Sequence, residues 1–109
     1  MHTGSITDIG NILVGHAEND IKTSGTTTLL FPEGAACGVD VRGSAPGTRE
    51  TDLLRSGNLV QKVHGISFSG GSAFGLDCAT GVMKYLREQS IGFDMGMCKI
   101  PIVTAAVIF

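Results

Sequence analysis

The sequence predicts an α/β fold, and three observations support this prediction. Short apolar or β-branched runs, which are typical of strands, recur along the 109 residues. One longer run, Ser72–Glu88, carries apolar residues at spacings of three and four, the pattern of one helical face. Sixteen glycines, about twice the usual share of roughly 7%, are spread over turn positions. The length allows at most one domain, and a hydrophobic content of 42% suffices for a core.

The first half of the chain predicts a set of short strands. An apolar run ends the segment Asp8–Val14, which predicts a strand, and the polar segment Gly15–Gly25 predicts a loop. Thr26–Phe31 is rich in threonine and leucine, and Ala36–Arg42 alternates weakly. Because Pro32-Glu33-Gly34 is typical of a turn, we expect these last two segments to pair as an antiparallel hairpin.

The segment that follows predicts a loop and one helical turn. Gly43–Thr48 contains Ala-Pro-Gly and reads as a loop, and Glu50–Leu54 predicts a short helical turn capped by Thr48 or Thr51. Val63–Phe68 is apolar and predicts a strand, which leads into the helix Ser72–Glu88.

The predicted helix has a ridge of small residues, Gly71, Gly75 and Ala79, at a spacing of four. Such a ridge allows a backbone to pack closely, and tight helix–sheet packing is the favoured explanation over ligand binding. We expect Ser90 or Gly92 to end the helix. Its apolar face consists of Leu76, Ala79, Val82, Met83 and Leu86.

The end of the chain predicts a loop, Ile91–Lys99, and an almost wholly apolar strand, Ile100–Phe109. A strand of this composition is typical of the centre of a sheet, buried on both faces. Because the sequence stops within this strand, we expect the polypeptide to be one part of a larger domain.

The turn Gly70-Gly71-Ser72 is the main candidate binding site. It joins a strand to a helix, so backbone N–H groups and the positive end of the helix dipole meet there. Glycines let a ligand approach the main chain, and an anion or oxyanion suits such a place. The alternative is a tight turn in which Ser72 only caps the helix.

Composition argues against several classes of function. The net charge is −2, with no basic patch and no Trp, which argues against a nucleic-acid partner. Cys37, Cys78 and Cys98 lack the spacing of metal ligands, so we expect small buried residues in a reducing compartment and neither a metal nor a cofactor. The N-terminus lacks the pattern of a signal peptide, and no apolar run could span a membrane. These features predict a cytoplasmic protein.

Serine-hydrolase chemistry within the chain is disfavoured. A nucleophile elbow requires Gly-x-Ser-x-Gly, whereas Phe74 stands where the second glycine belongs. His64 begins a strand and is interpreted as a structural histidine. The acid that a triad with Ser72 requires would have to come later in the chain, where almost nothing remains. For Arg49, Glu50 and Asp52 we favour a solvated helix start, although a loop that contacts substrate or a neighbouring subunit is the alternative.

Several motifs together resemble one family. They are Thr26-Thr27-Thr28 after Ser24-Gly25, the run Ala45–Leu54 (APGTRETDLL), the run Ser69–Leu76 (SGGSAFGL), and the strand Pro101–Phe109. In this order they resemble the N-terminal part of the DmpA-like aminopeptidases, which include L-aminopeptidase/D-esterases and β-peptidyl aminopeptidases. The Pro-Gly-Thr-Arg-Glu-Thr run (Pro46–Thr51) and the Gly-Gly-Ser-Ala-Phe-Gly-Leu run (Gly70–Leu76) are the specific ones, and the resemblance covers essentially the whole chain.

The resemblance implies a layered α-β-β-α sandwich, shared with ornithine acetyltransferases, and a self-cleaving precursor about three times as long. It implies that the Ser or Thr exposed by cleavage is the nucleophile and that its own α-amine serves as base. The chain would then act on a peptide or amide with its missing C-terminal portion or a companion chain. Gly70, Gly71 and Ser72 would line the substrate cleft.

The sequence departs from the family in two ways. The nucleophile lies outside the 109 residues, so no catalytic residue is assigned. The Glu that binds the substrate amine in the β-peptidyl members aligns near Val107, so this amine anchor is missing here. Two other functions therefore stay open beside the hydrolase. One is a non-catalytic module that assembles as a homo-oligomer through open sheet edges, and the other is a small-anion binder at the Gly-Gly-Ser turn.

Overall fold

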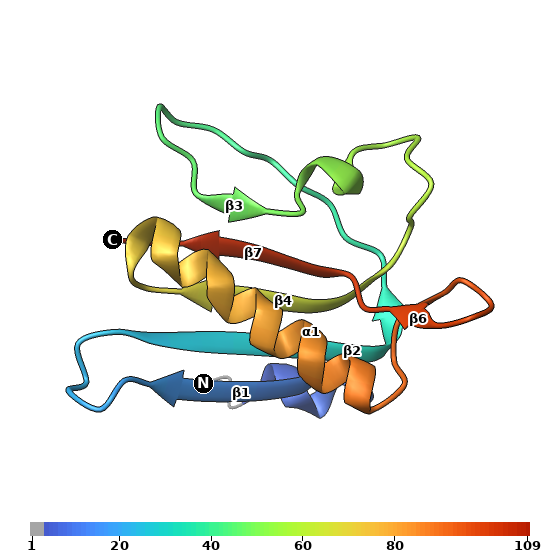
Figure 1. Ribbon diagram of the computed structural model, residues 1–109, viewed down its shortest axis with the longest axis horizontal. Coiled ribbons are helices and arrows are strands. Elements are labelled where there is room, and N and C mark those ends of the chain that lie inside the picture. The colour runs from blue at the N-terminus through green and yellow to red at the C-terminus, as the bar shows by residue number, and fades with distance from the viewer. Residues whose placement is uncertain (1–3) are drawn as a thin grey trace.

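A computed structural model describes residues 4–109 as one five-stranded sheet with a helix across one face (Figure 1). The strand order is β1-β2-β4-β7-β3, and a separate two-stranded hairpin, β5-β6, lies beside it. This mixed sheet with its covering helix confirms the predicted α/β class. The elements are η1 (Ile6–Asp8), β1 (Leu13–Glu18), β2 (Gly25–Ala35), β3 (Thr48–Arg49), η2 (Asp52–Leu54), β4 (Val63–Ser69), η3 (Ser72–Asp77), α1 (Cys78–Glu88), β5 (Phe93–Asp94), β6 (Lys99–Ile100) and β7 (Val103–Val107), where η marks a 3₁₀-helix.

The middle of the sheet is the parallel pair β4 and β7, which run in register from Gly65↔Val103 to Ser69↔Val107. Parallel neighbours need a crossover connection, and the segment containing η3, α1, β5 and β6 supplies it. Both strands therefore end at the same edge of the sheet. Figure 1 shows the chain terminus and the start of the helical segment side by side at that edge.

The N-terminal half differs from the prediction. Its first strand is Leu13–Glu18, and it pairs antiparallel with β2, so most of the predicted strand Asp8–Val14 is a turn and part of the predicted loop is strand. The predicted hairpin with Ala36–Arg42 is wrong. Strand β2 continues through Pro32 with a register shift between Leu30 and Ala35. Because β1 and β4 occupy both edges of β2, no edge remains for another strand.

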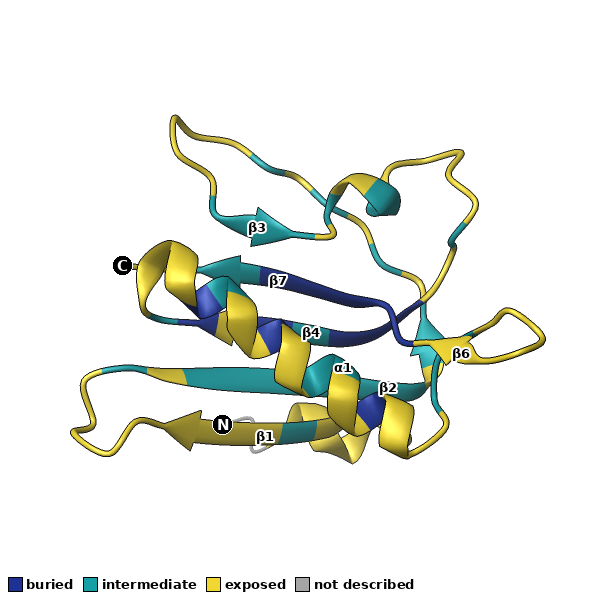
Figure 2. Cartoon of the chain, in the orientation of Figure 1, coloured by how far each residue is buried: buried dark blue, intermediate teal, exposed yellow. Residues whose placement is uncertain are grey.

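The hydrophobic core lies between α1 and the centre of the sheet (Figure 2). Ala79 and Leu86 of α1 are fully buried against Val103 and Ala105 of β7. A Cβ placed on Gly65 of β4 would lie 3.3 Å from a methyl group of Val82, so glycine allows the helix to approach the sheet. Val82 and Met83 of the predicted apolar face also pack against this core.

The predicted helix Ser72–Glu88 is two elements. Residues Ser72–Asp77 form a 3₁₀-helix and only Cys78–Glu88 is α-helix. Gly75 explains the close packing of this first part, since a Cβ there would overlap the carbonyl oxygen of Gly70. Ser90, with φ of +57°, follows the helix, as predicted for its end.

The end of the chain is partly as predicted. The expected loop Ile91–Lys99 contains the short hairpin of β5 and β6. Burial of the last strand holds for residues 101–105, whereas Ile108 and Phe109 are exposed. Within residues 4–109, no helix is long and apolar enough to cross a membrane.

Candidate functional site

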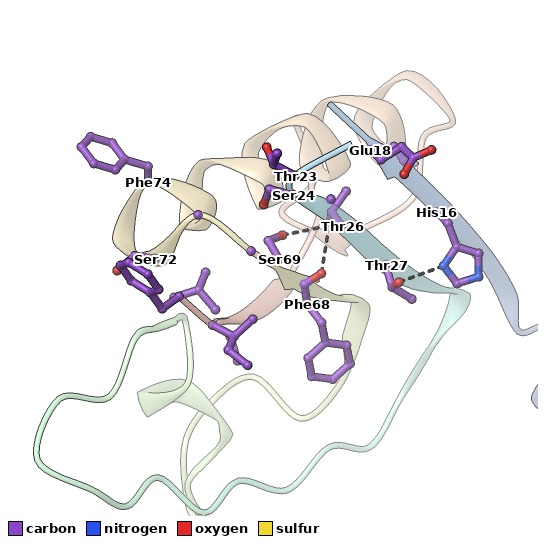
Figure 3. A pocket seen from close by; sticks show the side chains of 18 of the residues that line it. His16, Glu18, Thr23, Ser24, Thr26, Thr27, Phe68, Ser69, Ser72 and Phe74 are labelled. Atoms are coloured by element: carbon purple, nitrogen blue, oxygen red, sulfur yellow. Dashed lines mark hydrogen bonds between the residues drawn. The ribbon is translucent and has the colours of Figure 1, made fainter. Parts of the chain in front are cut away.

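A pocket of about 1320 Å³ opens where β4 and β7 end (Figure 3). In open α/β sheets, ligands bind outside the carboxyl ends of parallel strands. The turn Gly70–Ser72 and the chain end at Ile108 and Phe109 line this pocket, together with the ends of β1 and β2. Two segments that the sequence singled out, far apart along the chain, therefore meet at one cavity.

The turn does not offer the row of free N–H groups that the sequence predicted. The N–H of Gly70 donates to the carbonyl of Gly25 at 2.9 Å, and the N–H of Ser72 donates to the carbonyl of Ile108 at 3.1 Å. The acceptors lie just beyond the residues of β2 and β7 that pair with β4, so the hydrogen bonding of the sheet continues into the turn. Of the three, only the Gly71 N–H has no acceptor within residues 4–109.

The predicted helix cap at Ser72 is also wrong. Ser72 has φ of +57° and its hydroxyl makes no capping hydrogen bond, while Gly71 (φ +89°) occupies the cap position. The left-handed backbone turns the Ser72 side chain to the pocket (Figure 3). The hydroxyl is therefore exposed at the cavity instead of being used within the helix.

Three hydroxyl groups of β2 and β4 form a hydrogen-bonded cluster directly before the turn. The Ser69 hydroxyl donates to Thr26 Oγ1 at 2.8 Å (Figure 3). Thr26 Oγ1 also lies 3.2 Å from Ser67 Oγ. Ser67 is fully buried, and Ser69 is 4% exposed. This cluster was not predicted from the sequence. Its only signal is the alternation of serine along β4, which places Ser67 and Ser69 on one face.

The other side of the pocket is polar and comes from β1. His16 Nδ1 lies 2.8 Å from Thr27 Oγ1 across the β1–β2 pair, and both residues line the pocket (Figure 3). Glu18 and Lys22 line the same side. His16, Glu18 and Lys22 were not named as candidate site residues from the sequence, because their segment, Gly15–Gly25, was predicted to be a loop.

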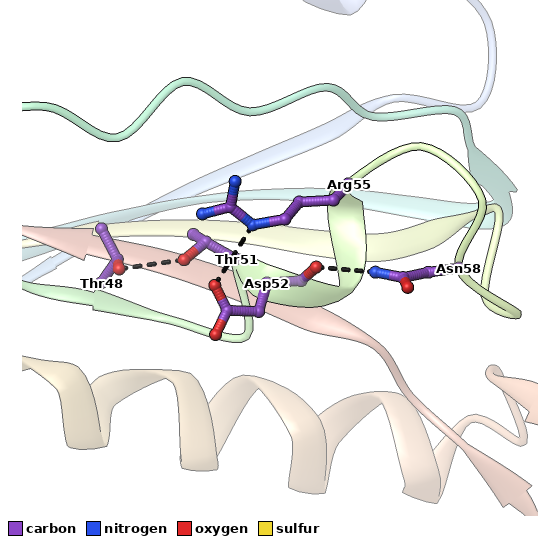
Figure 4. Close-up of polar contacts among 5 residues, drawn as sticks. All are labelled: Thr48, Thr51, Asp52, Arg55 and Asn58. Carbon is purple, nitrogen blue, oxygen red and sulfur yellow. Dashed lines mark hydrogen bonds and ion pairs between the residues drawn. The ribbon is translucent and has the colours of Figure 1, made fainter.

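A second pocket, of about 500 Å³, lies at the Pro-Gly-Thr-Arg-Glu-Thr segment (Figure 4). Thr51 is the N-cap residue of η2, as predicted, but its hydroxyl makes no capping hydrogen bond and lies instead 3.0 Å from the hydroxyl of Thr48. Asp52 pairs with Arg55 at 3.5 Å, with both side chains exposed. Asp52 and the neighbouring Glu50 are thus solvated, as the favoured interpretation holds.

Arg49 is the exception in this charged group, and the prediction of a solvated side chain is wrong for it. Its guanidinium donates to the carbonyl of Leu76 at 3.2 Å and to Thr80 Oγ1 at 2.7 Å, and reaches Met83 Sδ at 3.5 Å. Strand β3 points this side chain at the helix, because its partner Ala105 lies on the helix-covered face. Arg49 thereby connects the two specific sequence motifs.

Both motifs lie within a match to one known protein family. Residues 4–109 match the family model described as peptidase family S58. The chain belongs to this family. The match confirms the resemblance to the DmpA-like aminopeptidases that the two specific motifs carry.

The family relatives include both peptidases and an oligomer hydrolase. An uncharacterized aminopeptidase of Mycobacterium tuberculosis is 48% identical over 96% of this chain, and one of Mycobacterium leprae is 47% identical over the same share. A 6-aminohexanoate-oligomer endohydrolase of a Kocuria species is 31% identical over 94% of the chain. The chain spans 33%, 31% and 26% of the lengths of these relatives.

His64 has the structural role predicted for it. It is 7% exposed, and its Nδ1 accepts a hydrogen bond of 3.1 Å from the N–H of Ile102. Burial, and secondly the charge of Lys62, lower the pKa of His64 below its ordinary value. The ring is thus a neutral acceptor that joins the starts of β4 and β7, at the opposite end from the pocket.

The cysteines of this S58 chain are more exposed than predicted. Cys78 and Cys98 are exposed and Cys37 is partly buried, and burial raises the pKa of the Cys37 thiol. Cys78 begins α1 on its outward side and Cys98 lies in the β5–β6 turn, so neither reaches the core. Within residues 4–109, no group of three His, Cys, Asp or Glu side chains could hold a metal ion.

Proposed function

We propose that this chain is the N-terminal part of a self-processing hydrolase of family S58 that acts on peptide or amide bonds. The relatives are named aminopeptidase and 6-aminohexanoate-oligomer endohydrolase, which supports an amide substrate. In this proposal the nucleophile is the N-terminal Ser or Thr of a second fragment, outside these 109 residues. A hydroxyl beside its own α-amine needs no separate histidine. Within residues 4–109, the histidine that lines the pocket, His16, is hydrogen-bonded to Thr27 and not to a serine or a carboxylate.

The observation that carries the proposal is the meeting of the Gly70–Ser72 turn with the end of β7 at one pocket. We propose Gly70, Gly71 and Ser72 as substrate-binding residues. Because Gly70 and Ser72 already donate within the sheet, the Gly71 N–H and the Ser72 hydroxyl are the groups of this turn that would contact the substrate.

We further propose that the sheet is one layer of an α-β-β-α sandwich. Helix α1 covers one face, whereas Phe68, which points to the other face, is 51% exposed (Figure 2). Large apolar side chains left in water favour association with a further layer. The missing C-terminal portion, or a companion chain, would supply that layer and the nucleophile together.

The test is an intact mass spectrum of the natively purified protein under denaturing conditions, followed by assay with amino-acid p-nitroanilides. We expect a second species that begins with Ser or Thr, and anilide hydrolysis in the fractions that contain both species. A Ser72→Ala variant should lose at least part of its kcat/KM, with Ser56→Ala, an exposed serine outside the pocket, as the matched control.

A single species of about 11.3 kDa with no amide hydrolysis would contradict the proposal. Full activity in Ser72→Ala would remove the side chain of Ser72 from the site while leaving the family assignment intact. Size-exclusion chromatography of the same preparation tests the predicted homo-oligomer.

A further inference from the structure

Ser24, in the loop between β1 and β2, packs against the Gly70–Ser72 turn and lines the pocket (Figure 3). A Cβ placed on Gly70 would overlap the Ser24 hydroxyl oxygen, and one on Gly71 would lie 4.0 Å from it. The Ser24 side chain therefore occupies the space beside the main chain of the turn. Because Gly70 has no positive φ, this contact, and not backbone conformation, explains why residue 70 is a glycine.

The hydroxyl of Ser24 makes no hydrogen bond within residues 4–109. Every buried side-chain nitrogen or oxygen of these residues does have a partner. Ser24 is half-buried at the wall of the cavity, so its unpaired hydroxyl is open to a ligand there. A serine hydroxyl can both donate and accept a hydrogen bond.

The position of Ser24 is fixed by Asn19 at the start of the same loop. Asn19 Oδ1 accepts from the N–H of Thr23 at 2.9 Å and from the N–H of Ser24 at 3.4 Å, and Asn19 Nδ2 donates to Thr23 Oγ1 at 3.0 Å. The N–H of Asn19 also donates to the Ser24 carbonyl at 2.9 Å. Asn19 itself does not line the pocket, so it acts on the cavity through the residues that it holds.

We propose that the Ser24 hydroxyl binds the main-chain amide of the substrate beside the Gly70–Ser72 turn, and that Asn19 is the positioning residue for Ser24. The inference rests on the proposed amide hydrolysis, and it adds one binding residue and one positioning residue to that site. A main-chain amide offers a carbonyl acceptor and an N–H donor, and a hydroxyl can pair with either.

The first test measures alanine p-nitroanilide hydrolysis by the natively purified protein with all the chains it carries. We expect Ser24→Ala to lower kcat/KM by about two- to tenfold, which corresponds to the loss of one neutral hydrogen bond. The melting temperature should stay unchanged, because the hydroxyl has no partner to lose within residues 4–109. Ser56→Ala, an exposed serine outside the pocket, is the matched control and should change neither value.

Variants of Asn19 separate a positioning role from a merely structural one. Asn19→Ala should lower kcat/KM about as far as Ser24→Ala, and the double variant should be no worse than Ser24→Ala alone. Asn19→Asp keeps an oxygen acceptor for the N–H groups of Thr23 and Ser24, so it should restore most of the activity. Losses that multiply in the double variant would show that Asn19 does not act through Ser24, and would overturn its positioning role.

The placement of the Ser24 side chain can be tested without a substrate. Gly70→Ala should lower the melting temperature by at least about 4 °C, because the new methyl group meets the Ser24 hydroxyl. In the Ser24→Ala background the methyl group would lie 3.5 Å from the Cβ of residue 24, an ordinary contact, so the loss should be smaller. An equal loss in both backgrounds would place the Ser24 hydroxyl elsewhere and overturn the inference.

Binding of trialanine amide separates failure of this inference from failure of the proposed hydrolysis. A rise in melting temperature with trialanine amide that Ser24→Ala reduces supports Ser24 as a binding residue even if no anilide is cleaved. Anilide hydrolysis with an unchanged kcat/KM in Ser24→Ala overturns the inference and leaves amide hydrolysis in place. The absence of both hydrolysis and stabilisation in the wild type would overturn both proposals.

Discussion

The two ends of the parallel pair β4–β7 differ in how far their side chains are buried. At their starts Val63 is 1% exposed and Ile102 is 8% exposed, and the ring of His64 joins the two strands. At their ends Phe68 is half exposed and Phe109 is fully exposed beside the pocket. The same two strands thus have a buried end, called the closed end below, and an exposed end at the pocket, called the open end.

This difference shows where stability and function can be separated in the chain. Substitutions at the closed end remove packed contacts, so they should act mainly on the free energy of unfolding. Substitutions at the pocket end remove little packing, so they should act on ligands with little effect on stability. Each prediction below tests one part of this contrast.

The largest effect is expected for Leu86→Ala. Leu86 is fully buried between α1 and the sheet, and its truncation leaves a cavity as well as losing buried apolar surface. We expect a loss of about 2–5 kcal/mol in the free energy of unfolding, measured by urea denaturation. Phe74→Ala at the pocket should change it by less than about 0.5 kcal/mol, and equal losses in the two variants would contradict the contrast.

A pair of glycine substitutions in the helical segment should have effects of opposite sign. Gly75→Ala would push a Cβ into the carbonyl oxygen of Gly70, so we expect a loss of about 1–3 kcal/mol. Gly81 lies in α1 with open space around it, so Gly81→Ala should stabilise the protein by about 0.5–1 kcal/mol. Melting temperatures of the two variants provide the measurement. Stabilisation by both would show that the turn relaxes away from Gly75.

Arg49→Lys tests the connection between the two specific motifs. Lysine keeps the charge but cannot donate to both the Leu76 carbonyl and Thr80 Oγ1 from one planar group. We therefore expect the free energy of unfolding to fall by about 1–2 kcal/mol. Hydrogen exchange should increase at the amides of 72–80, and the exposed Arg42→Lys is the matched control. Unchanged exchange in the Arg49 variant would mean that the contacts add nothing to the order of this segment.

Sequence reasoning succeeded where local pattern and packing agree. The strand Val63–Phe68 and the apolar face of the helix are predicted correctly because their periodicity matches their burial in the structure. The predictions for β1 and for Ala36–Arg42 were wrong, because whether each segment forms a strand depends on which strand it pairs with. Strand pairing is a property of the assembled sheet, so no local pattern specifies it.

The strand-to-helix turn was predicted in position but not in detail. The glycines and Ser72 indicated the turn, and the turn does line the pocket. The use of two of its N–H groups by Gly25 and Ile108 depends on residues more than 30 positions away. For the same reason Glu18 was missed, because it enters the pocket only through its register with β2.

The smallest expected effect concerns His64 at the closed end. Burial, followed by the charge of Lys62, lowers the pKa of His64 in the folded state, so the unfolded chain binds a proton more readily. The stability that this group contributes is therefore complete above the unfolded pKa of about 6.5 and is lost as the pH falls below it. The protonated ring also cannot accept the hydrogen bond from Ile102.

The measurement is the free energy of unfolding between pH 5 and pH 8, in the wild type and in His64→Asn. Asparagine can keep an acceptor for the Ile102 N–H but does not titrate, so its curve should be flatter below about pH 6.5. His16→Gln is the control, since His16 is exposed at the pocket end and should leave the His64 contribution in place. If His16→Gln flattens the curve and His64→Asn does not, the pH-dependent group lies at the open end, and the closed end is not the part of the sheet that responds to acid.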